Sequence, residues 1–399
     1  MQQPKLRFKE YQNGQLVPIE FKDLMEPGTY GIKRGPFGGA LKKEIFVKDG
    51  FAVYEQQHAI YKDFENIRYF IKEEKYNELI SFKIEAGDLI MSCSGTIGKI
   101  AVFPEEARPG VINQALIRFR ADKNKVDSKF LYHLLNSEYM QKKMLSINPG
   151  SAIKNLIAVP ELKKIKINLF NIHEQKKIAS FLTLLSKKIE KQLEKVEKLE
   201  QLKKGMMQKI FSHELRFKDE DSGEFPQWRR TTLKGEVDIF NNMRKPVTEN
   251  IRQKGKYPYY GATGIIDYVQ DYIFDGEYLL LAEDGANIVT RSAPVVYKTK
   301  DKFWVNNHAH IMKPKANNDF NFFYQVLENI NYIPYNSGTA QPKLNVESIK
   351  KIPLKIPIHD EQRKVGMFLL TVDSKIEKEK EKLMVLEEQK KGFMQRIFI

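Results

Sequence analysis

The sequence predicts two globular α/β domains held at opposite ends of an antiparallel two-helix coiled coil, with a pseudo-twofold internal repeat. Three observations support this fold: a duplicated helical segment, heptad spacing of apolar residues in both copies, and a looser duplication of the chain before each copy. We expect a first domain at 1–170, a first helix at 171–214, a second domain at 215–356 and a second helix at 357–399.

The duplicated segment begins with "IHEQKKIASFL" at Ile172 and returns as "IHDEQRKVGMFL" at Ile358. An alignment without gaps, at an offset of 187, runs from Glu174 on Glu361 to Phe211 on Phe398, and 20 of its 38 positions are identical. Similar composition alone would not also match the glycines and the closing Ile-Phe pairs in one frame. The chain therefore contains an internal duplication.

Apolar residues recur in alternating steps of three and four in both copies, and Lys and Glu fill most other positions. This spacing predicts two long helices with one apolar seam each. The seam residues are Leu182, Leu185, Ile189, Val196, Leu199 and Met206, and then Leu369, Val372, Ile376, Leu383, Leu386 and Phe393. Polar residues interrupt the seam at the same places in both copies, where they fix the register or face a partner: Gln192 with Glu379, and Lys203 with Lys390.

The antiparallel sense follows from the length of the helices. Each covers about 34 residues, or about 50 Å. Parallel helices would require the second domain to carry the chain back over that length, whereas antiparallel helices bring the ends of that domain side by side, as is usual for domains. The repeat then places the first domain at the opposite end.

Both domains have short strands broken by Gly-rich turns and helical spacing at equivalent places. We expect strands at 82–93, 111–121, 277–284 and 308–314, and helices over 129–144 and 319–330. The weaker repeat pairs "LRFKE" at Leu6 with "LRFKD" at Leu215, "GSAIKNL" at 150–156 with "GTAQPKL" at 338–344, and "NQALI" at 113–117 with "NHAHI" at 307–311.

Composition suits a polyanion partner, although a merely basic protein would show the same net charge. The net charge is +15 and is spread over the four segments as +7, +4, +3 and +1. No apolar run approaches 18 residues, so a soluble, cytoplasmic protein without membrane contact is expected. The single cysteine, Cys93, excludes a disulfide and favours a buried thiol.

Glycines and cations cluster in two loops, where flexible backbone can approach phosphates. The loop at 30–44 carries Lys33, Arg34, Lys42 and Lys43, and the loop at 244–264 carries Lys245, Arg252 and Lys256 among three tyrosines. Plain turn geometry and tyrosines packed in a core would explain the same residues.

Catalytic motifs are not evident, and neither a catalytic set nor a metal site is predicted. The stretch "SGTIGKI" at 94–100 lacks the spacing of a phosphate-binding loop, and "SINPG" at 146–150 fails the Asn-Pro-Pro-Tyr methyltransferase pattern at its third position. His308 and His310 lack a carboxylate cluster for a metal, and Glu283 with Asp284 lack a lysine at nuclease spacing. The sequence therefore predicts a binding protein.

The chain resembles the specificity subunits of type I restriction-modification systems over nearly its whole length. The resemblance rests on "GPFGGALKK" at 35–43, "SGTIGKIAVF" at 94–103, the stretch 257–288, the paired "EQKK" and "EQRK" helix starts, and the endings "KKGMMQKIF" and "KKGFMQRIF". It implies two target-recognition domains, each contacting one half of a split, asymmetric site in double-stranded DNA.

The resemblance also implies partners. The helices resemble a spacer that docks two methyltransferase subunits, which bind S-adenosylmethionine, while further restriction subunits act as motor and nuclease with ATP and Mg. None of that chemistry belongs to this chain, which is expected to be no enzyme. On the helices, we expect partner contacts at Phe181, Gln192, Lys203, Phe368, Glu379 and Lys390.

Base choice requires side chains at the groove edges, where Arg or Lys suits guanine and Asn or Gln suits adenine. From their loop positions, the base-contacting candidates are Tyr61, Lys99, Lys154 and Asn155 in the first domain, and Tyr260, Thr263, Arg291, Gln341 and Lys343 in the second. The phosphate-contacting candidates are the seven cations of the two loops described above.

Two other classes of protein compete with this interpretation. A coiled-coil scaffold that binds proteins without DNA specificity would explain the helices, but it leaves the positive charge of both domains unexplained. An enzyme with an unrecognised site, a DNA nuclease or a fused methyltransferase, would modify or cleave DNA by itself.

Overall fold

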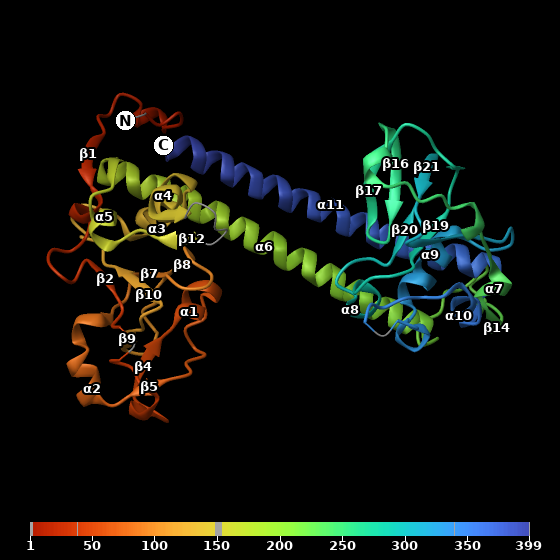
Figure 1. Ribbon diagram of the computed structural model, residues 1–399, viewed down its shortest axis with the longest axis horizontal. Coiled ribbons are helices and arrows are strands. Elements are labelled where there is room, and N and C mark those ends of the chain that lie inside the picture. The colour runs from red at the N-terminus through yellow and green to blue at the C-terminus, as the bar shows by residue number, and fades with distance from the viewer. Residues whose placement is uncertain (1–2, 38, 148–153, 339, 399) are drawn as a thin grey trace. The chain divides into compact units, whose positions relative to one another are not determined.

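The computed structural model describes residues 3–37, 39–147, 154–338 and 340–398, with side chains at 146, 147 and 154 excepted. The chain divides into two compact units, Met1–Leu193 with Glu381–Ile399 (unit 1) and Glu194–Lys380 (unit 2). Both divisions fall inside the long helices α6, Ile172–Phe211, and α11, His359–Ile397, drawn in Figure 1. The divisions lie 380 − 193 = 187 residues apart, the offset of the duplicated helical sequence.

In its described residues, unit 1 combines short strands with five short α-helices besides its shares of α6 and α11. The helices are α1 Gln56–Tyr61, α2 Glu73–Glu78, α3 Ser128–Asn136, α4 Glu138–Met144 and α5 Val159–Lys163. The strands are β1 Val17–Glu20, β2 Ile32–Arg34, β3 Phe46–Val47, β4 Phe51–Tyr54, β5 Phe70–Ile71, β6 Lys83–Ile84, β7 Leu89–Ser92, β8 Ile100–Val102, β9 Gly110–Ile112, β10 Leu116–Phe119, β11 Leu145–Ile147, β12 Lys154–Leu156 and β13 Lys166–Leu169.

Two sheets organise unit 1. One has the order β2-β10-β7-β8 with antiparallel neighbours, and the other has the order β3-β5-β4-β9-β6, in which β4 and β9 run parallel. Helices α3 and α4 lie between the first sheet and α6, while β4, β5 and α2 lie farther from α6 (Figure 1). A short turn leads from the end of β9 into β10, so the parallel pair ends next to the first sheet.

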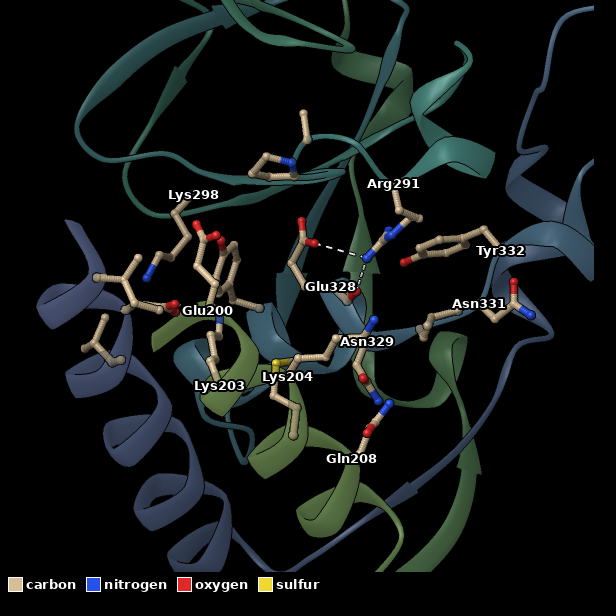
Figure 2. Close-up of a pocket in the computed structure, with 18 of the residues that line it drawn as sticks. Glu200, Lys203, Lys204, Gln208, Arg291, Lys298, Glu328, Asn329, Asn331 and Tyr332 are labelled. Carbon is tan, nitrogen blue, oxygen red and sulfur yellow. Dashed lines mark hydrogen bonds and ion pairs between the residues drawn. The ribbon is translucent and has the colours of Figure 1, made fainter. Parts of the chain in front are cut away.

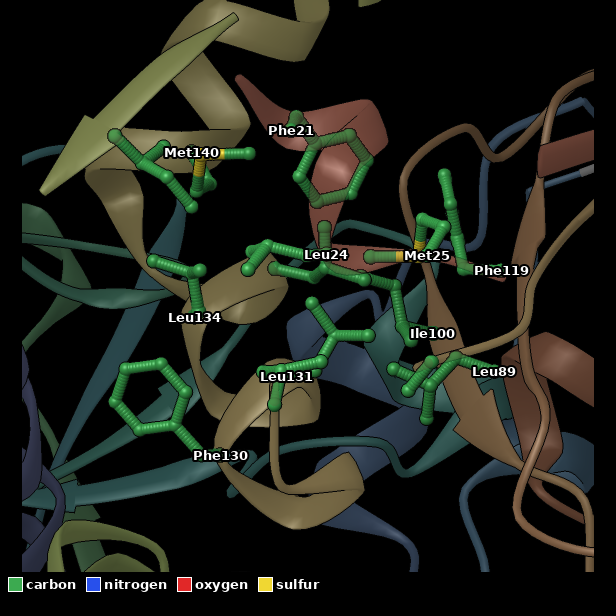
Figure 3. Close-up of a cluster of buried hydrophobic side chains, with 14 of the residues drawn as sticks. Phe21, Leu24, Met25, Leu89, Ile100, Phe119, Phe130, Leu131, Leu134 and Met140 are labelled. Atoms are coloured by element: carbon green, nitrogen blue, oxygen red, sulfur yellow. The ribbon is translucent and has the colours of Figure 1, made fainter. Parts of the chain in front are cut away.

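The main core of unit 1 lies between the first sheet and these helices. Alternating strand residues and one face of each helix point into it, as their spacing requires. Figure 3 shows part of this cluster, with Phe21, Leu24, Met25, Leu89, Ile100, Phe119, Phe130, Leu131, Leu134 and Met140. The start of α6 and the end of α11 join the same core through Ile178, Leu182 and Ile397.

Unit 2 repeats this plan with a different sequence. Its helices besides α6 and α11 are α7 Leu233–Glu236, α8 Asn287–Thr290, α9 Phe320–Asn329 and α10 Val346–Lys350. The strands are β14 Arg229–Thr232, β15 Val237–Ile239, β16 Lys254–Gly261, β17 Gly264–Val269, β18 Phe274–Asp275, β19 Leu279–Ala282, β20 Val296–Lys298, β21 Lys302–Val305, β22 Ala309–Pro314 and β23 Pro353–Ile356.

The sheets of unit 2 correspond to those of unit 1. The order β15-β22-β19-β20 matches β2-β10-β7-β8, and β16 pairs parallel with β21 as β4 does with β9. The core joins Phe322, Phe323 and Leu327 of α9 to Met207 of α6 and Leu369 of α11.

The two long helices pack against each other within each unit. In unit 1 the rings of Phe181 and Phe393 meet edge to face at 5.0 Å. In unit 2 Lys203 pairs with Asp373 at 2.6 Å, and Lys195 pairs with Glu379 at 3.0 Å. Rising numbers on α6 meet falling numbers on α11, so the helices are antiparallel there. All twelve predicted seam residues are buried or half-buried.

Several predicted elements are wrong in their bounds. The expected strand at 111–121 is two strands, β9 and β10, in different sheets, and the expected strand at 82–93 is divided into β6 and β7 by a turn in which Gly87 has φ 87°. The expected helix at 129–144 is α3 and α4. Ser137 is extended between them, and its hydroxyl caps α4 by accepting from the backbone N–H of Met140 at 3.2 Å.

Candidate nucleic-acid interface

Four loops of unit 1 converge where the parallel strands β4 and β9 end. The backbone N–H of Asn113, just after β9, donates to the carbonyl of Tyr54 at 2.9 Å. The Asn113 side chain accepts from the backbone N–H of Ala115 at 3.0 Å, and the Ala115 carbonyl accepts from Cys93 after β7 at 2.8 Å. The carboxyl ends of parallel strands are a common place for ligand-binding loops.

The Gly-rich loop crosses this cluster at Gly35. Its backbone N–H donates to the Leu116 carbonyl at 2.9 Å. A Cβ at this position would lie 1.9 Å from the Asn113 carbonyl oxygen, so only glycine permits the crossing. We call the loops after β2, β4, β7 and β9 the unit 1 loop cluster.

Four of the cations predicted to contact DNA are exposed in or beside this cluster: Arg34, Lys42, Lys43 and Lys99. Lys42, Lys43 and Lys99 form no ion pair within the described part of the chain, so their ammonium groups are available to an anion. Lys33 differs because its ammonium lies 4.6 Å above the ring of Phe82 and its side chain is half-buried. Neighbouring strand residues face opposite ways, which separates Lys33 from Arg34.

Burial keeps the Cys93 thiol of the loop cluster protonated. It raises the pKa of the thiol to about 12, and the nearby Arg34 guanidinium offsets part of that rise. Cys93 is therefore a packed side chain and no nucleophile.

Two other arginines of unit 1 contribute no accessible charge. Arg120, directly after β10, binds Asp88 through two hydrogen bonds of 2.8 and 2.7 Å. Arg118 is fully buried and donates to the Tyr30 carbonyl at 2.7 Å. Burial lowers the pKa of Arg118 to about 10, so it remains charged at neutral pH. These two cations stabilise the sheet.

The remaining predicted base-contacting residues of unit 1 lie on other elements. Tyr61 is 76% exposed and is the last residue of α1. The first residue of that helix, Gln56, lies near Gly95 of the loop cluster, so Tyr61 is at the far end of the helix from it. Asn155 lies in β12, paired with Ser146 of β11. Lys154 starts that strand, but its side chain lies outside the described residues.

Unit 2 forms an equivalent loop cluster at the end of its parallel pair, β16 and β21. Asn306 donates its backbone N–H to the Tyr260 carbonyl at 3.0 Å and accepts from the backbone N–H of His308 at 2.8 Å. The His308 carbonyl accepts from the backbone N–H of Glu283 at 2.9 Å. These bonds reproduce those around Asn113, so two unrelated loop sequences adopt one arrangement.

A carboxylate organises the cations of the unit 2 cluster. Arg244 binds Glu283 at 2.5 Å and donates to the Asn307 and Ala309 carbonyls, while Lys343 lies 3.5 Å from Glu283. Burial acts to raise the pKa of Glu283, but the Arg244 hydrogen bond and the surrounding positive charge outweigh it and lower the pKa. The carboxylate therefore stays ionised at neutral pH.

The structure brings Lys343, Gln341 and Thr263 to this cluster. Lys343 pairs with Asp284 in an isolated bridge, Gln341 is exposed two residues before it, and Thr263 is exposed in the turn between β16 and β17. The exposed ring of His308 also bonds to Asp284 at 2.6 Å. His310, in contrast, is buried and bonds to the Leu344 carbonyl at 2.9 Å.

Tyr260 does not project from the cluster. Its side chain is 8% exposed and meets Phe303 edge to face at 5.7 Å, so the expectation of an accessible base contact is wrong.

The other cations predicted in unit 2 differ in position and in contacts. Arg252 pairs with Asp267 at 3.3 Å and stacks on Tyr259, which makes it a structural residue. Lys256 is exposed at the opposite end of β16, and Lys245 is exposed next to Arg244.

Arg291 lies in a cavity of about 990 Å³, which is lined by α6, α8, α9, α11 and the segments that follow α8 and α9 (Figure 2). Its guanidinium pairs with Glu328 at 3.2 Å. The Glu328 carboxylate also accepts from the backbone N–H groups of Val295 and Val296. Arg291 therefore lines this cavity through its ion pair with Glu328 and does not lie in the loop cluster.

The helix residues predicted to face partners have contacts inside their own units. Phe181 is half-buried against Phe8 and Phe393, and Phe368 lies against Phe217. The segments 6–9 and 215–218 thus cover part of both rings, and contacts of Phe181 and Phe368 with a partner stay a prediction.

The polar seam residues are likewise enclosed. Lys203 and Glu379 form the ion pairs described above, and Gln192 is half-buried. Lys390 is half-buried too, and burial, together with the nearby Lys62, lowers its pKa. Their contacts with a partner stay a prediction.

Arg244 and the two asparagines that shape the clusters were not among the predicted site residues, and His308 had been considered only as a metal ligand. The echo of "NQALI" and "NHAHI" was the available signal, because Asn113 begins the first stretch and Asn306 immediately precedes the second. Among the described residues, no group of three or more His, Cys, Asp or Glu side chains is arranged to hold a metal ion. Within the same part of the chain, no helix has the length and apolar character needed to cross a membrane.

Comparison with known proteins agrees with two similar units. The family model described as type I restriction modification DNA specificity domain matches residues 38–204 and again 226–388. The crystal structure of the type I restriction-modification system S subunit from M. genitalium superposes with a TM-score of 0.63 at 19% identity, covering 100% of this chain and 99% of that chain. This likeness supports the fold.

Two curated relatives have names that begin "Putative type I restriction enzyme". The "MjaX specificity subunit" of Methanocaldococcus jannaschii is 25% identical over 347 residues, which is 82% of this chain and 80% of that protein. The "specificity subunit S.HindORF215P" of Haemophilus influenzae is 40% identical over 121 residues, which is 30% of this chain and 31% of that protein. With two matches to the family model across more than half of its length, the chain belongs to the family of type I restriction-modification specificity subunits.

Proposed function

We propose that the chain selects the DNA sequence for a type I restriction-modification complex, with each unit contacting one half of a bipartite, asymmetric duplex site. The observation that carries the proposal is the duplicated loop cluster. Each copy lies at the end of a parallel strand pair. The two copies share the same pattern of backbone hydrogen bonds but differ in their side chains. Two such clusters with different side chains suit two different half-sites.

The exposed cations give each cluster a way to bind DNA. Lys42, Lys43 and Lys99 in unit 1, and Lys245 with Lys343 in unit 2, are exposed and would contact phosphates or groove edges. Sequence choice would come from the side chains between them, with Asn307 and Gln341 suited to adenine and Lys343 to guanine.

We also propose that α6 and α11 form one antiparallel coiled coil that acts as the spacer and docks two methyltransferase subunits. The seam burial and the antiparallel contacts within each unit support this arrangement. The methyl donor S-adenosylmethionine, and the ATP and Mg of the restriction subunits, would be bound by those partners. This chain would contribute recognition and no catalysis.

The test is to co-express the chain with the methyltransferase subunit encoded beside it and to map methylated bases by long-read sequencing. We expect a two-part motif with a fixed gap that disappears when this chain is omitted. Asn307→Ala should relax the motif in one half and leave the other half unchanged. Methylation that ignores this chain would contradict the proposal and favour a protein-binding scaffold, whereas modification by the chain alone would indicate an enzyme.

A further inference from the structure

Phe37 is far more exposed to solvent than is usual for an apolar side chain. Its side chain is 84% exposed, more than any other large hydrophobic residue in the described part of the chain. It stands in the Gly-rich loop that follows β2, two residues after Gly35 crosses the loop cluster. A phenylalanine ring in water forgoes the stabilisation that burial would give, and a polar residue would fill an exposed turn equally well.

Described residues of the loop on both sides of Phe37 are anchored. Gly35 is fixed against Leu116 on one side. On the other side, Ala40, Leu41 and Ile45 pack against the buried cluster of β4 and β9. The backbone N–H of Ala40 donates to the Phe37 carbonyl at 3.0 Å. The smaller apolar residues therefore pack inside, and the largest one points out.

Exposed cations flank Phe37 in the sequence of the loop. Arg34 precedes it by three residues, and Lys42 and Lys43 follow within six; all three are exposed. An apolar group flanked by phosphate-binding cations matches the way in which some proteins insert a Phe, Leu, Ile or Met side chain between base steps.

Unit 2 places apolar residues in its corresponding loop. The loop after β15, the strand equivalent to β2, carries Met243 at 43% and Ile251 at 70% exposure, next to the exposed Lys245 and near Lys254. The two loop sequences are unrelated, yet each combines exposed apolar and cationic side chains. A single exposed hydrophobic residue is ordinary, but the same combination at equivalent places in both units requires a reason.

We propose that Phe37 is a wedge that inserts its ring into the base stack of the duplex bound by unit 1. The inference rests on the proposed function and adds a contact that depends on unstacking and not on hydrogen bonding. Insertion would unstack one base step, and flexible pyrimidine–purine steps would accept it most readily. Phe37 would thus favour certain steps without contacting a base edge.

The wedge and the lysines differ in their dependence on salt. A phosphate contact releases counterions, so its loss makes the salt dependence of affinity shallower. Loss of a stacked ring lowers affinity at every salt concentration and leaves that slope unchanged. Stacking contributes enough that removing Phe37 should weaken binding about tenfold.

The experiment uses the full-length chain co-expressed with its methyltransferase subunit. The wild-type complex first selects its preferred duplex from a random-sequence library. That duplex is then labelled with 2-aminopurine at each position in turn, and fluorescence, affinity and salt slope are measured for wild type, Phe37→Ala and Phe37→Leu. Val17→Ala is the matched control, because Val17 is another exposed apolar residue of unit 1, 59% exposed, and lies in β1 outside the loop cluster.

We expect one base step to brighten with wild type and with Val17→Ala. Phe37→Ala should abolish that signal and weaken binding about tenfold at an unchanged salt slope, and Phe37→Leu should retain part of both. Phe37→Ala that binds and brightens the duplex as wild type does would overturn the wedge alone. A library from which no sequence is enriched would overturn the proposed function, and the wedge with it.

Discussion

At the scale of single residues, neighbouring cations of the Gly-rich loop have opposite surroundings. Lys42 and Lys43 are exposed without an ion pair within the described ranges, whereas Lys33 is half-buried over Phe82. Net charge alone cannot distinguish them. The side-chain surroundings divide them into cations that can contact phosphate and one that packs.

The first prediction tests this division. The double variant Lys42→Ala and Lys43→Ala should bind all duplex sequences more weakly by a similar factor, because phosphate contacts carry no sequence information. The slope of log affinity against log salt should become shallower by about 2. Lys33→Ala is the matched control and should leave the slope nearly unchanged. Binding is measured between low and moderate KCl concentrations, and a loss confined to one sequence would show that Lys42 and Lys43 contact bases.

The second prediction concerns His133 of α3. Its side chain is buried and bonds to the Thr183 hydroxyl at 3.1 Å. Burial lowers its pKa to about 4, helped by Lys390 and Lys62 and opposed by Asp127. The unfolded chain therefore binds the proton more tightly than the folded chain does. The stability due to the neutral ring is complete above about pH 6.5 and is lost as the pH falls toward 4.

The full loss should amount to about 3 kcal/mol, since each pKa unit corresponds to about 1.4 kcal/mol. About 2 kcal/mol of it should appear between pH 7 and pH 5, because the folded-state pKa lies below that interval. His133→Gln should remove most of this pH dependence, because the equivalent position of α9 is already a buried glutamine, Gln325. Urea unfolding at pH 7 and pH 5 measures both chains. An equal loss of stability in the variant would show that other groups cause the acid sensitivity.

At the scale of elements, Gly366 lets α11 approach the start of α9. A Cβ there would lie 2.4 Å from a carboxylate oxygen of Asp319 and 2.7 Å from the Phe322 nitrogen, which together form the cap of α9. We expect Gly366→Ala to destabilise unit 2 by about 2 kcal/mol through overpacking and loss of the cap. Hydrogen exchange should increase in α9. It should not increase in α3, the equivalent helix of unit 1, where α6 already carries Ala179 at the position of Gly366.

Gly205 and Gly392 are the matched controls for Gly366→Ala. Both are helical, and a Cβ at either would meet nothing within 4 Å. Alanine at either position should therefore raise stability by about 0.5–1 kcal/mol. A stabilising Gly366→Ala would show that α9 shifts to accommodate the methyl group.

The elements that could be predicted from sequence are those held by local spacing. The heptads located α6 and α11, and their seam residues are covered as expected. The loop clusters could not be predicted, because they depend on β4 pairing with β9 across more than fifty residues, and on β16 pairing with β21. Tyr260 and Arg291 were misplaced for the same reason: core contacts and the pairing with Glu328 are distant in sequence.

At the scale of the whole molecule, the repeat extends to buried polar contacts at the ends of the long helices. Glu174 binds Arg7 and Glu361 binds Arg216, so each helix start is joined to an "LRFK" segment. Gln175 and Gln362 each accept from the backbone N–H of the residue that caps α3 or α9, Asp127 or Asp319. Each unit is thus tied to one helix start by the same contacts, so changes within the helices need not disturb the loop clusters.

The last prediction uses that independence. If α6 and α11 form the proposed spacer, removing residues 190–196 from α6 and the equivalent 377–383 from α11 keeps the heptad register and shortens each helix by about 10 Å. At about 3.4 Å per base pair, the permitted gap between the half-sites should shrink by about three base pairs, and both half-sites should remain the same. Methylation mapping of the co-expressed complex measures the gap. Removing the heptad from α6 alone is the control, and it should abolish methylation because the seams no longer match. A folded, active double deletion with the original gap would contradict the spacer role.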